Sequence, residues 1–221
     1  MLLTALCVVT MALVAALVTA EQLGATTARY VLKPLASVGF LVTAWHVGAL
    51  TDGGTYGAWI FAGLVLSFFG DVFLMPDDRP NVFLAGLGSF LLGHVAYAVA
   101  FVTFGMDWAV AGASALVLVP IAVAVWRWLS PHVPGDMRIP VIAYVVVITT
   151  MVAHSLGAWR AGGSLLMPIG ATMFWISDLA VARRQFIDPS PRSAIWGLPL
   201  YYGAQLVLAI SVAAVQTPEG P

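Results

Sequence analysis

Long apolar runs separated by short polar breaks dominate this sequence. Eight runs can be drawn, each close to the roughly 20 residues that an α-helix needs to cross a bilayer. They cover residues 1–20, 32–50, 57–75, 82–104, 108–128, 139–157, 163–182 and 194–215. The breaks contain turn-forming residues, such as Thr-Asp-Gly-Gly at 51–54 and Asp-Pro-Ser-Pro at 188–191. The pattern predicts a bundle of eight transmembrane helices.

Composition supports an all-α polytopic membrane protein. The chain is 61% hydrophobic and 9% charged, whereas soluble domains carry about 25% charged residues. Lipid leaves helices or closed barrels as the only spanning structures, and the runs lack the alternation of strands. Residues 1–216 are predicted to form one helical domain, and 217–221 a short disordered tail.

Charge and cysteine content exclude several function classes. The net charge is −1 and no basic stripe is present, so a nucleic-acid partner is not expected. The single cysteine cannot form an intrachain disulfide or a cysteine-based metal site. We therefore expect neither a metal nor a cofactor.

The orientation follows from the basic residues. The first run resembles a signal peptide at Val18-Thr19-Ala20, but it lacks a basic start and is too long, so a retained helix is expected. With eight spans, the odd-numbered loops carry Arg29, Lys33, Arg79, Arg127, Arg138, Arg183, Arg184 and Arg192. The other side carries Arg160 alone. The positive-inside rule then makes the odd-numbered loops cytoplasmic and leaves both termini outside.

Two aspartates lie inside the apolar runs, and they are costly there. Asp71 and Asp178 each follow a small residue near the inner end of a span. A carboxylate at the bilayer centre costs about 2.5–3.5 kcal/mol on insertion scales. The predicted topology places both in the cytoplasmic half, together with Lys33, Tyr201 and Gln205. Their shared depth favours a function over packing alone.

Other polar residues in the spans have simpler interpretations. His94 and Tyr97 fall near the midplane, and a lone histidine there is more often structural. Tyrosines at this depth usually form hydrogen bonds between helices, and this is the simpler interpretation of Tyr202. Ser177 has no histidine near it in sequence at matching depth, which disfavours a serine triad. A metal site formed by Asp71, Asp178 and His94 has no support from spacing.

Two further patterns concern how the helices pack. Gly63, Ser67 and Gly70 recur at helical spacing and predict close helix–helix approach. Asp71 and Asp178 lie 107 positions apart (178 − 71), close to half of the 221-residue chain. This offset suggests two four-helix repeats in the same orientation. Two carboxylates that share a site cannot both ionise easily, and such a pair provides an acid and a base at neutral pH.

Several motifs together resemble the lysoplasmalogenase (YhhN-like) family of eight-helix membrane hydrolases. They are Lys33-Pro34, Gly70-Asp71, GSFLLGHVAY at 88–97, GATMFWISD at 170–178 and YYGAQ at 201–205. The resemblance extends from about residue 30 to 210. It implies hydrolysis of the vinyl ether bond of lysoplasmalogens, which gives a fatty aldehyde and glycerophosphoethanolamine or glycerophosphocholine. The expected partners are a lysophospholipid and the bilayer.

The resemblance also gives the polar residues provisional roles. Asp71 and Asp178 would supply acid and base, in an order that the sequence leaves open. The substrate-binding candidates are Lys33, Tyr201, Tyr202, Gln205, His94, Tyr97 and Ser177. Among them, Lys33 would hold the headgroup phosphate, with Arg79 or Arg183 as weaker candidates. The expected location is a bacterial inner membrane, with the active site toward the cytoplasm.

Two other functions use the same residues. A small proton-coupled transporter also needs intramembrane carboxylates and a repeated fold. It predicts a site at the midplane, whereas both aspartates lie toward one side. A purely structural bundle would instead bridge the aspartates to Lys33 and to tyrosines.

Overall fold

The computed structural model describes residues 1–76 and 79–216, and this part of the chain consists of helices joined by short turns and loops. The helices are α1 (Leu2–Gln22), α2 (Thr26–His46), α3 (Gly54–Phe73), α4 (Pro80–Phe104), α5 (Trp108–Leu129), α6 (Arg138–Arg160), α7 (Leu166–Phe186) and α8 (Ala194–Gln216). Short 3₁₀ turns precede α6 and α8. The described residues contain no strand, which confirms the all-α class. The predicted tail at 217–221 lies outside them.

Six of the described helices are long and apolar enough to cross a membrane: α1, α3, α4, α5, α6 and α8. The chain is thus a multi-pass membrane protein. Helix α2 is less apolar because it carries Arg29 and Lys33, and α7 carries Asp178 together with two arginines. Spanning by all eight helices, with both termini outside, stays a prediction.

Helix α2 differs most from its predicted segment. It begins at Thr26 and ends at His46, whereas the apolar run covers 32–50. The run misses the first turns because Thr26, Thr27 and Arg29 are polar, although all three belong to the helix. The end comes early because Gly48 adopts φ 81°, a left-handed conformation that stops a helix and favours glycine.

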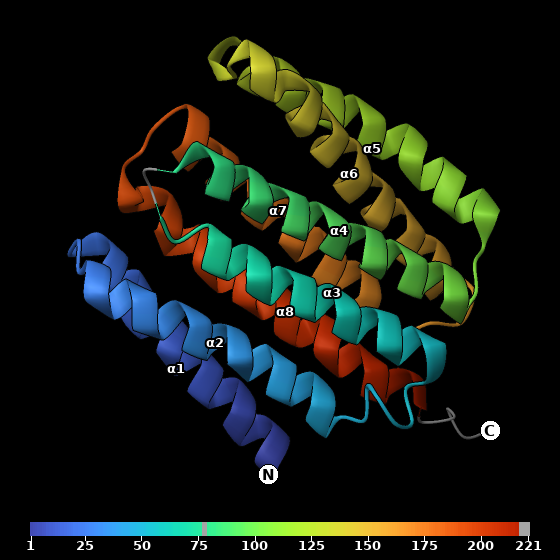
Figure 1. Cartoon of the computed structure of the whole chain (residues 1–221). Helices are drawn as coiled ribbons and strands as arrows, with labels where there is room; N and C mark the ends of the chain where they lie inside the picture. Colours follow the sequence, from blue (N-terminus) through green and yellow to red (C-terminus); the bar gives the residue numbers. More distant parts are fainter. Residues whose placement is uncertain (77–78, 217–221) are drawn as a thin grey trace.

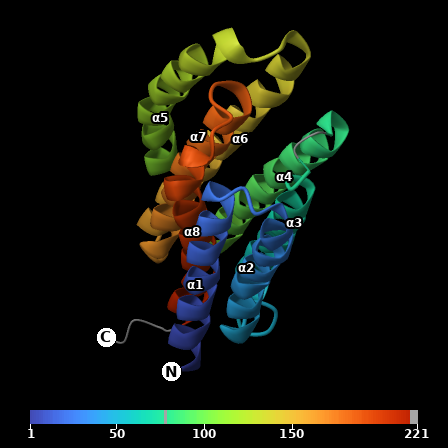
Figure 2. The same cartoon turned by 90° about the vertical axis from the view of Figure 1, so that its left-hand side faces the viewer.

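The helices lie side by side along one direction (Figure 1). Helices α1 and α2 form one edge, α5 and α6 form the other, and α3, α4, α7 and α8 lie between them. Helix α5 packs mainly on α6, and its buried residues are Ala111 and Leu129. The C-terminal end of α5 stands apart from the C-terminal end of α3 (Figure 2). The predicted cytoplasmic loops belong to this end of the bundle.

Close packing of α3 on α4 gives the first testable prediction. A Cβ atom at Gly63 would overlap the ring of Tyr97, which is fully buried. We expect Gly63→Ala to lower the free energy of unfolding by about 1–3 kcal/mol, because an overpacked core forces side chains from their rotamers. Thermal unfolding in detergent measures the change.

Gly88→Ala on α4 is the matched control, because a Cβ there meets no atom within 4 Å. This variant should be neutral or slightly more stable, since alanine favours helix over glycine. Equal effects at both positions would contradict the close approach at Gly63.

Candidate active site

Asp71 lies in the last turn of α3 and joins three helices. Its Oδ2 accepts hydrogen bonds from Tyr201 Oη of α8, at 2.6 Å, and from Ser37 Oγ of α2, at 2.7 Å. Lys33 Nζ, also on α2, lies 3.4 Å from Asp71 Oδ1. The Asp71 side chain is 3% exposed. Three donors thus surround a buried carboxylate that would otherwise be costly at this depth.

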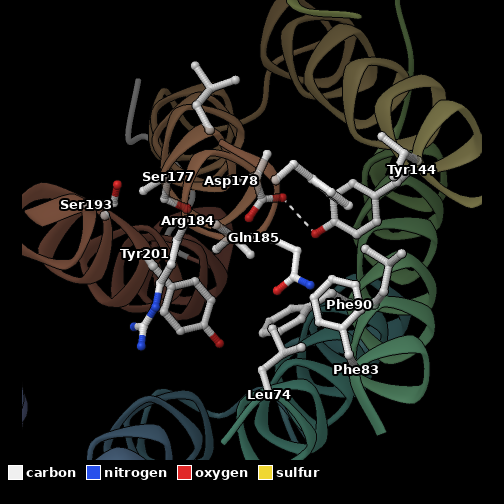
Figure 3. A pocket seen from close by; sticks show the side chains of 18 of the residues that line it. Leu74, Phe83, Phe90, Tyr144, Ser177, Asp178, Arg184, Gln185, Ser193 and Tyr201 are labelled. Carbon is white, nitrogen blue, oxygen red and sulfur yellow. Dashed lines mark hydrogen bonds between the residues drawn. The ribbon is translucent and has the colours of Figure 1, made fainter. Parts of the chain in front are cut away.

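Asp178 lies on α7 and has fewer partners. Tyr144 Oη of α6 donates to Asp178 Oδ2 at 2.7 Å (Figure 3). His94 Nε2 of α4 lies 3.6 Å from the same oxygen. The Asp178 side chain is 16% exposed, so it is more open than Asp71. No lysine or arginine forms an ion pair with it among the described residues.

Both aspartates line one cavity of about 1050 Å³ at the end of the bundle that carries the predicted cytoplasmic loops. Tyr144, Tyr201 and Ser177 also line it. Its lining also contains four basic residues, here called the basic rim, and two further acidic residues, Glu21 and Asp136. The basic residues are Arg29, Lys33, Arg79 and Arg184. Apolar side chains of α4, α5 and α6 complete the wall. The cavity therefore combines two carboxyl groups with an apolar wall, which suits a lipid chain, and with basic side chains, which suit a phosphate headgroup.

The comparison with protein families decides the assignment. The model of the YhhN family matches residues 28–212, which is most of the chain. This chain belongs to the YhhN family. The resemblance read from the sequence motifs is confirmed, and the match includes Asp71 and Asp178 but leaves all of α1 outside it.

Curated relatives of this YhhN protein are named lysoplasmalogenases. Lysoplasmalogenase TMEM86A of Homo sapiens is 33% identical over 165 residues, covering 72% of this chain and 67% of the relative. Lysoplasmalogenase TMEM86B of Sus scrofa is 31% identical over 171 residues, covering 77% and 70%. A lysoplasmalogenase of Mycobacterium tuberculosis is 31% identical over 140 residues, covering 58% and 50%. No solved structure matches the chain.

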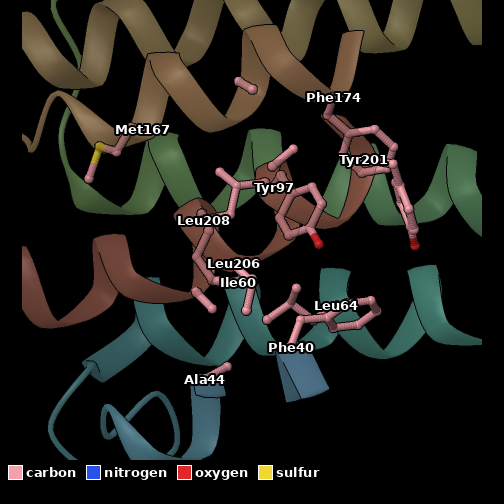
Figure 4. Close-up of a cluster of buried hydrophobic side chains, with 14 of the residues drawn as sticks. Phe40, Ala44, Ile60, Leu64, Tyr97, Met167, Phe174, Tyr201, Leu206 and Leu208 are labelled. Atoms are coloured by element: carbon pink, nitrogen blue, oxygen red, sulfur yellow. The ribbon is translucent and has the colours of Figure 1, made fainter. Parts of the chain in front are cut away.

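Four predicted site residues of the YhhN chain lie in its core rather than on the cavity wall: His94, Tyr97, Tyr202 and Gln205. Tyr97 Oη donates to Gln205 Oε1 at 2.7 Å, and both side chains are fully buried. Tyr202 is also fully buried, and its hydroxyl donates to Lys33 O at 3.2 Å. Figure 4 shows Tyr97 among apolar side chains such as Leu208, with Phe174 and Tyr201 on one side. These residues hold helices together, and the cavity lining contains none of them.

His94 and Ser177, both substrate-binding candidates, have different surroundings. His94, for which a structural role was the simpler interpretation, lies 3.6 Å from Asp178 Oδ2, and its ring centroid lies 4.4 Å from that of Phe174. Neither of its ring nitrogens has a hydrogen-bond partner among the described residues. Ser177 Oγ donates to Phe174 O at 2.7 Å, and the side chain is buried.

The arginine candidates are also corrected. Arg183 pairs with Asp188, 3.1 Å away, and is absent from the cavity lining, whereas Arg184 lines it. The backbone N–H of Ser190 donates to Asp188 and holds the pKa of that carboxyl below its usual value. The hydrophobicity of the run 163–182 gave no means of choosing between two adjacent arginines, because the choice depends on which side of α7 faces the cavity.

Sequence reasoning missed Tyr144 and Ser37, although the half-chain offset contains a signal for both. Ser37 precedes Asp71 by 34 residues, and Tyr144 precedes Asp178 by 34 residues. His94 and Tyr201, which lie beside Asp178 and Asp71 respectively, are 107 residues apart (201 − 94), as are the aspartates (178 − 71). Projection by this offset relates Ser37 to Tyr144 and His94 to Tyr201, so it would have found these neighbours of the two aspartates.

Proposed function

We propose that this YhhN protein hydrolyses the vinyl ether bond of lysoplasmalogens that carry ethanolamine or choline. The products are a fatty aldehyde and the glycerophospho-headgroup. The names of its relatives support this substrate. The observation that carries the proposal is that Asp71 and Asp178 line one cavity with an apolar wall and a basic rim.

Two carboxyl groups are enough for the chemistry. An acid transfers a proton to the vinyl carbon that is not bonded to oxygen, and the ether oxygen stabilises the oxocarbenium ion that forms at the other vinyl carbon. Water adds to this cation and loses a proton to a base, which gives a hemiacetal. The hemiacetal collapses to the aldehyde and the glycerol hydroxyl. Glycosidases use paired carboxyls on a similar cation.

The surroundings of the two aspartates support different roles. Lys33 lies beside Asp71, whereas the position 107 residues after Lys33 is Pro140, which cannot provide a cation. We assign Asp178 as the proton donor because it has no lysine partner and is the more exposed carboxyl. Asp71 then serves as the anion that faces the oxocarbenium ion and receives the proton of the water. Tyr201, which bonds to Asp71 and lines the cavity, orients that water.

The basic residues at the cavity end of the bundle support an orientation in the membrane. We place all eight helices across a bacterial inner membrane, with the cavity toward the cytoplasm. The side chains of Arg29, Lys33, Arg79 and Arg184 line the cavity, and Arg160 ends α6 at the opposite end. Substrate would enter from the cytoplasmic leaflet, with its alkenyl chain among apolar residues such as Leu87 and Ile148. No observation favours the transporter alternative, which needs a central site.

Aldehyde release tests the proposed function. The purified protein in detergent should release a fatty aldehyde from alkenyl lysophosphatidylethanolamine. It should leave the saturated alkyl analogue intact, because that ether has no double bond to protonate. An acyl lysophospholipid is the second control. Release of fatty acid from the acyl lipid without aldehyde from the alkenyl lipid would contradict the proposal.

A further inference from the structure

Three charged side chains from three helices meet at the mouth of the cavity. Glu21, in the last turn of α1, accepts a hydrogen bond from Arg184 Nη1 of α7 at 2.9 Å. Arg29 Nη1 of α2 lies 3.9 Å from the same Glu21 oxygen. All three residues line the cavity. The rim therefore presents one carboxylate between two guanidinium groups.

The two arginines differ in their exposure. Arg29 Nη2 donates to Met75 O, just after α3, at 2.7 Å, and its side chain is 11% exposed. The Arg184 side chain is 33% exposed and extends beside Tyr201 in the pocket (Figure 3). Glu21 is 8% exposed. Arg184 is thus the partner of Glu21 that an entering ligand can reach.

The rim lies on the entry side of the two aspartates. Arg184 follows Asp178 by six positions on α7, which is about 9 Å along the helix axis. Arg29 is one turn closer to the start of α2 than Lys33. A lysophospholipid whose vinyl ether reaches Asp178 would extend its glycerol and phosphate along this path to Glu21 and Arg184.

We propose that Glu21 and Arg184 form the headgroup site and select zwitterionic lysolipids, an inference that rests on the proposed function. The phosphodiester replaces Glu21 as a partner of the Arg184 guanidinium, which binds such oxygens in a bidentate manner. The ammonium group of the headgroup then pairs with Glu21. The phosphate thus takes the place of the Glu21 carboxylate beside Arg184, and the ammonium takes the place of the Arg184 guanidinium beside Glu21. A headgroup with phosphate alone would leave Glu21 facing a second anion, which disfavours it.

This assignment concerns a part of the chain that the family match does not include. Glu21 precedes residue 28, where the YhhN match begins. Headgroup preference in this protein therefore depends on α1, whereas both aspartates lie within the matched region. Lys33, the phosphate ligand expected from the sequence, is instead committed to Asp71.

Binding of two saturated ether lysolipids tests the headgroup site without any hydrolysis. One lipid carries phosphoethanolamine and the other a phosphate monoester, and their Kd values are measured by thermal stabilisation in detergent. The wild-type protein should prefer the phosphoethanolamine lipid. Glu21→Gln, which keeps the side-chain shape, should weaken binding of this lipid by about tenfold and remove the preference. Arg184→Gln should weaken binding of both lipids.

Arg183→Gln is the matched control, because Arg183 is adjacent in sequence but faces Asp188. It should bind both lipids as the wild type does. An unchanged preference in Glu21→Gln, or equal binding of both lipids by the wild type, overturns the headgroup site. If Glu21→Gln fails to fold, the double variant Glu21→Gln/Arg184→Gln, which removes both charges of the pair, provides the test. If the wild-type protein prefers the phosphoethanolamine lipid but releases no aldehyde from the alkenyl lipid, only the proposed hydrolysis is overturned.

Discussion

Replacing Asp178 with asparagine should lower kcat for aldehyde release by about 10²–10⁴-fold, the usual contribution of a general acid. The amide keeps the size of the carboxyl and can still accept from Tyr144, so the fold should persist. The amide has no acidic proton to give to the vinyl ether carbon. The measurement is steady-state aldehyde release in detergent micelles, with thermal unfolding as a check of the fold.

Asp188→Asn is the control for this variant. Asp188 lies just after the end of α7, is paired with Arg183 and does not line the cavity. Its loss should leave aldehyde release unchanged. Near wild-type kcat in a folded Asp178→Asn protein would exclude Asp178 as the proton donor. It would support the alternative in which the carboxyl only bridges helices.

Lys33→Met should destabilise the protein by about 3–5 kcal/mol, because removing one member of a buried ion pair leaves the other charge uncompensated. Lys33 is 12% exposed and Asp71 3% exposed, so water replaces the lost partner poorly. We also expect kcat to fall, since the anion beside the oxocarbenium ion loses the group that holds it. A role in phosphate binding alone would mainly raise KM. Thermal unfolding and aldehyde release measure the two effects.

The double variant Lys33→Met/Asp71→Asn separates structure from chemistry. With both charges removed, stability should return toward the wild-type value, because neither side chain is left as an unpaired ion. Aldehyde release should stay low, since the anion is absent. Full recovery of activity in the double variant would show that the pair is structural. No recovery of stability would contradict the direct coupling of Lys33 to Asp71.

Helix positions could be predicted well where hydrophobicity alone decides them. The run 82–104 corresponds to α4 at Pro80–Phe104, and the run 108–128 to α5 at Trp108–Leu129. The prediction for α2 was wrong at both ends because hydropathy treats a charged first turn as a loop. A charged residue near a helix end can stay helical in a membrane protein when it reaches an ion partner or the interface, as Arg29 and Lys33 do.

The candidate site could be predicted in part, through depth. Asp71, Asp178, Lys33 and Tyr201 were placed in the same half of the bundle, and all four line the cavity. Gln205 was grouped with them because it lies one turn beyond Tyr201, yet it bonds to Tyr97 in the core. Depth locates a residue along the helix axis, but it does not give the rotation of the helix about that axis.

The sequence by itself determined the membrane class, the helical fold, the family and the two costly aspartates. These depend on composition, on run length and on the cost of a charge in lipid, all of which are local properties of the chain. Only the tertiary structure decided that Lys33 pairs with Asp71, that Tyr144 and His94 approach Asp178, and that Glu21 of α1 meets Arg184 of α7. These contacts join residues as many as 163 positions apart. They depend on which helices are neighbours and which faces they present, and side-chain packing across the whole bundle sets both.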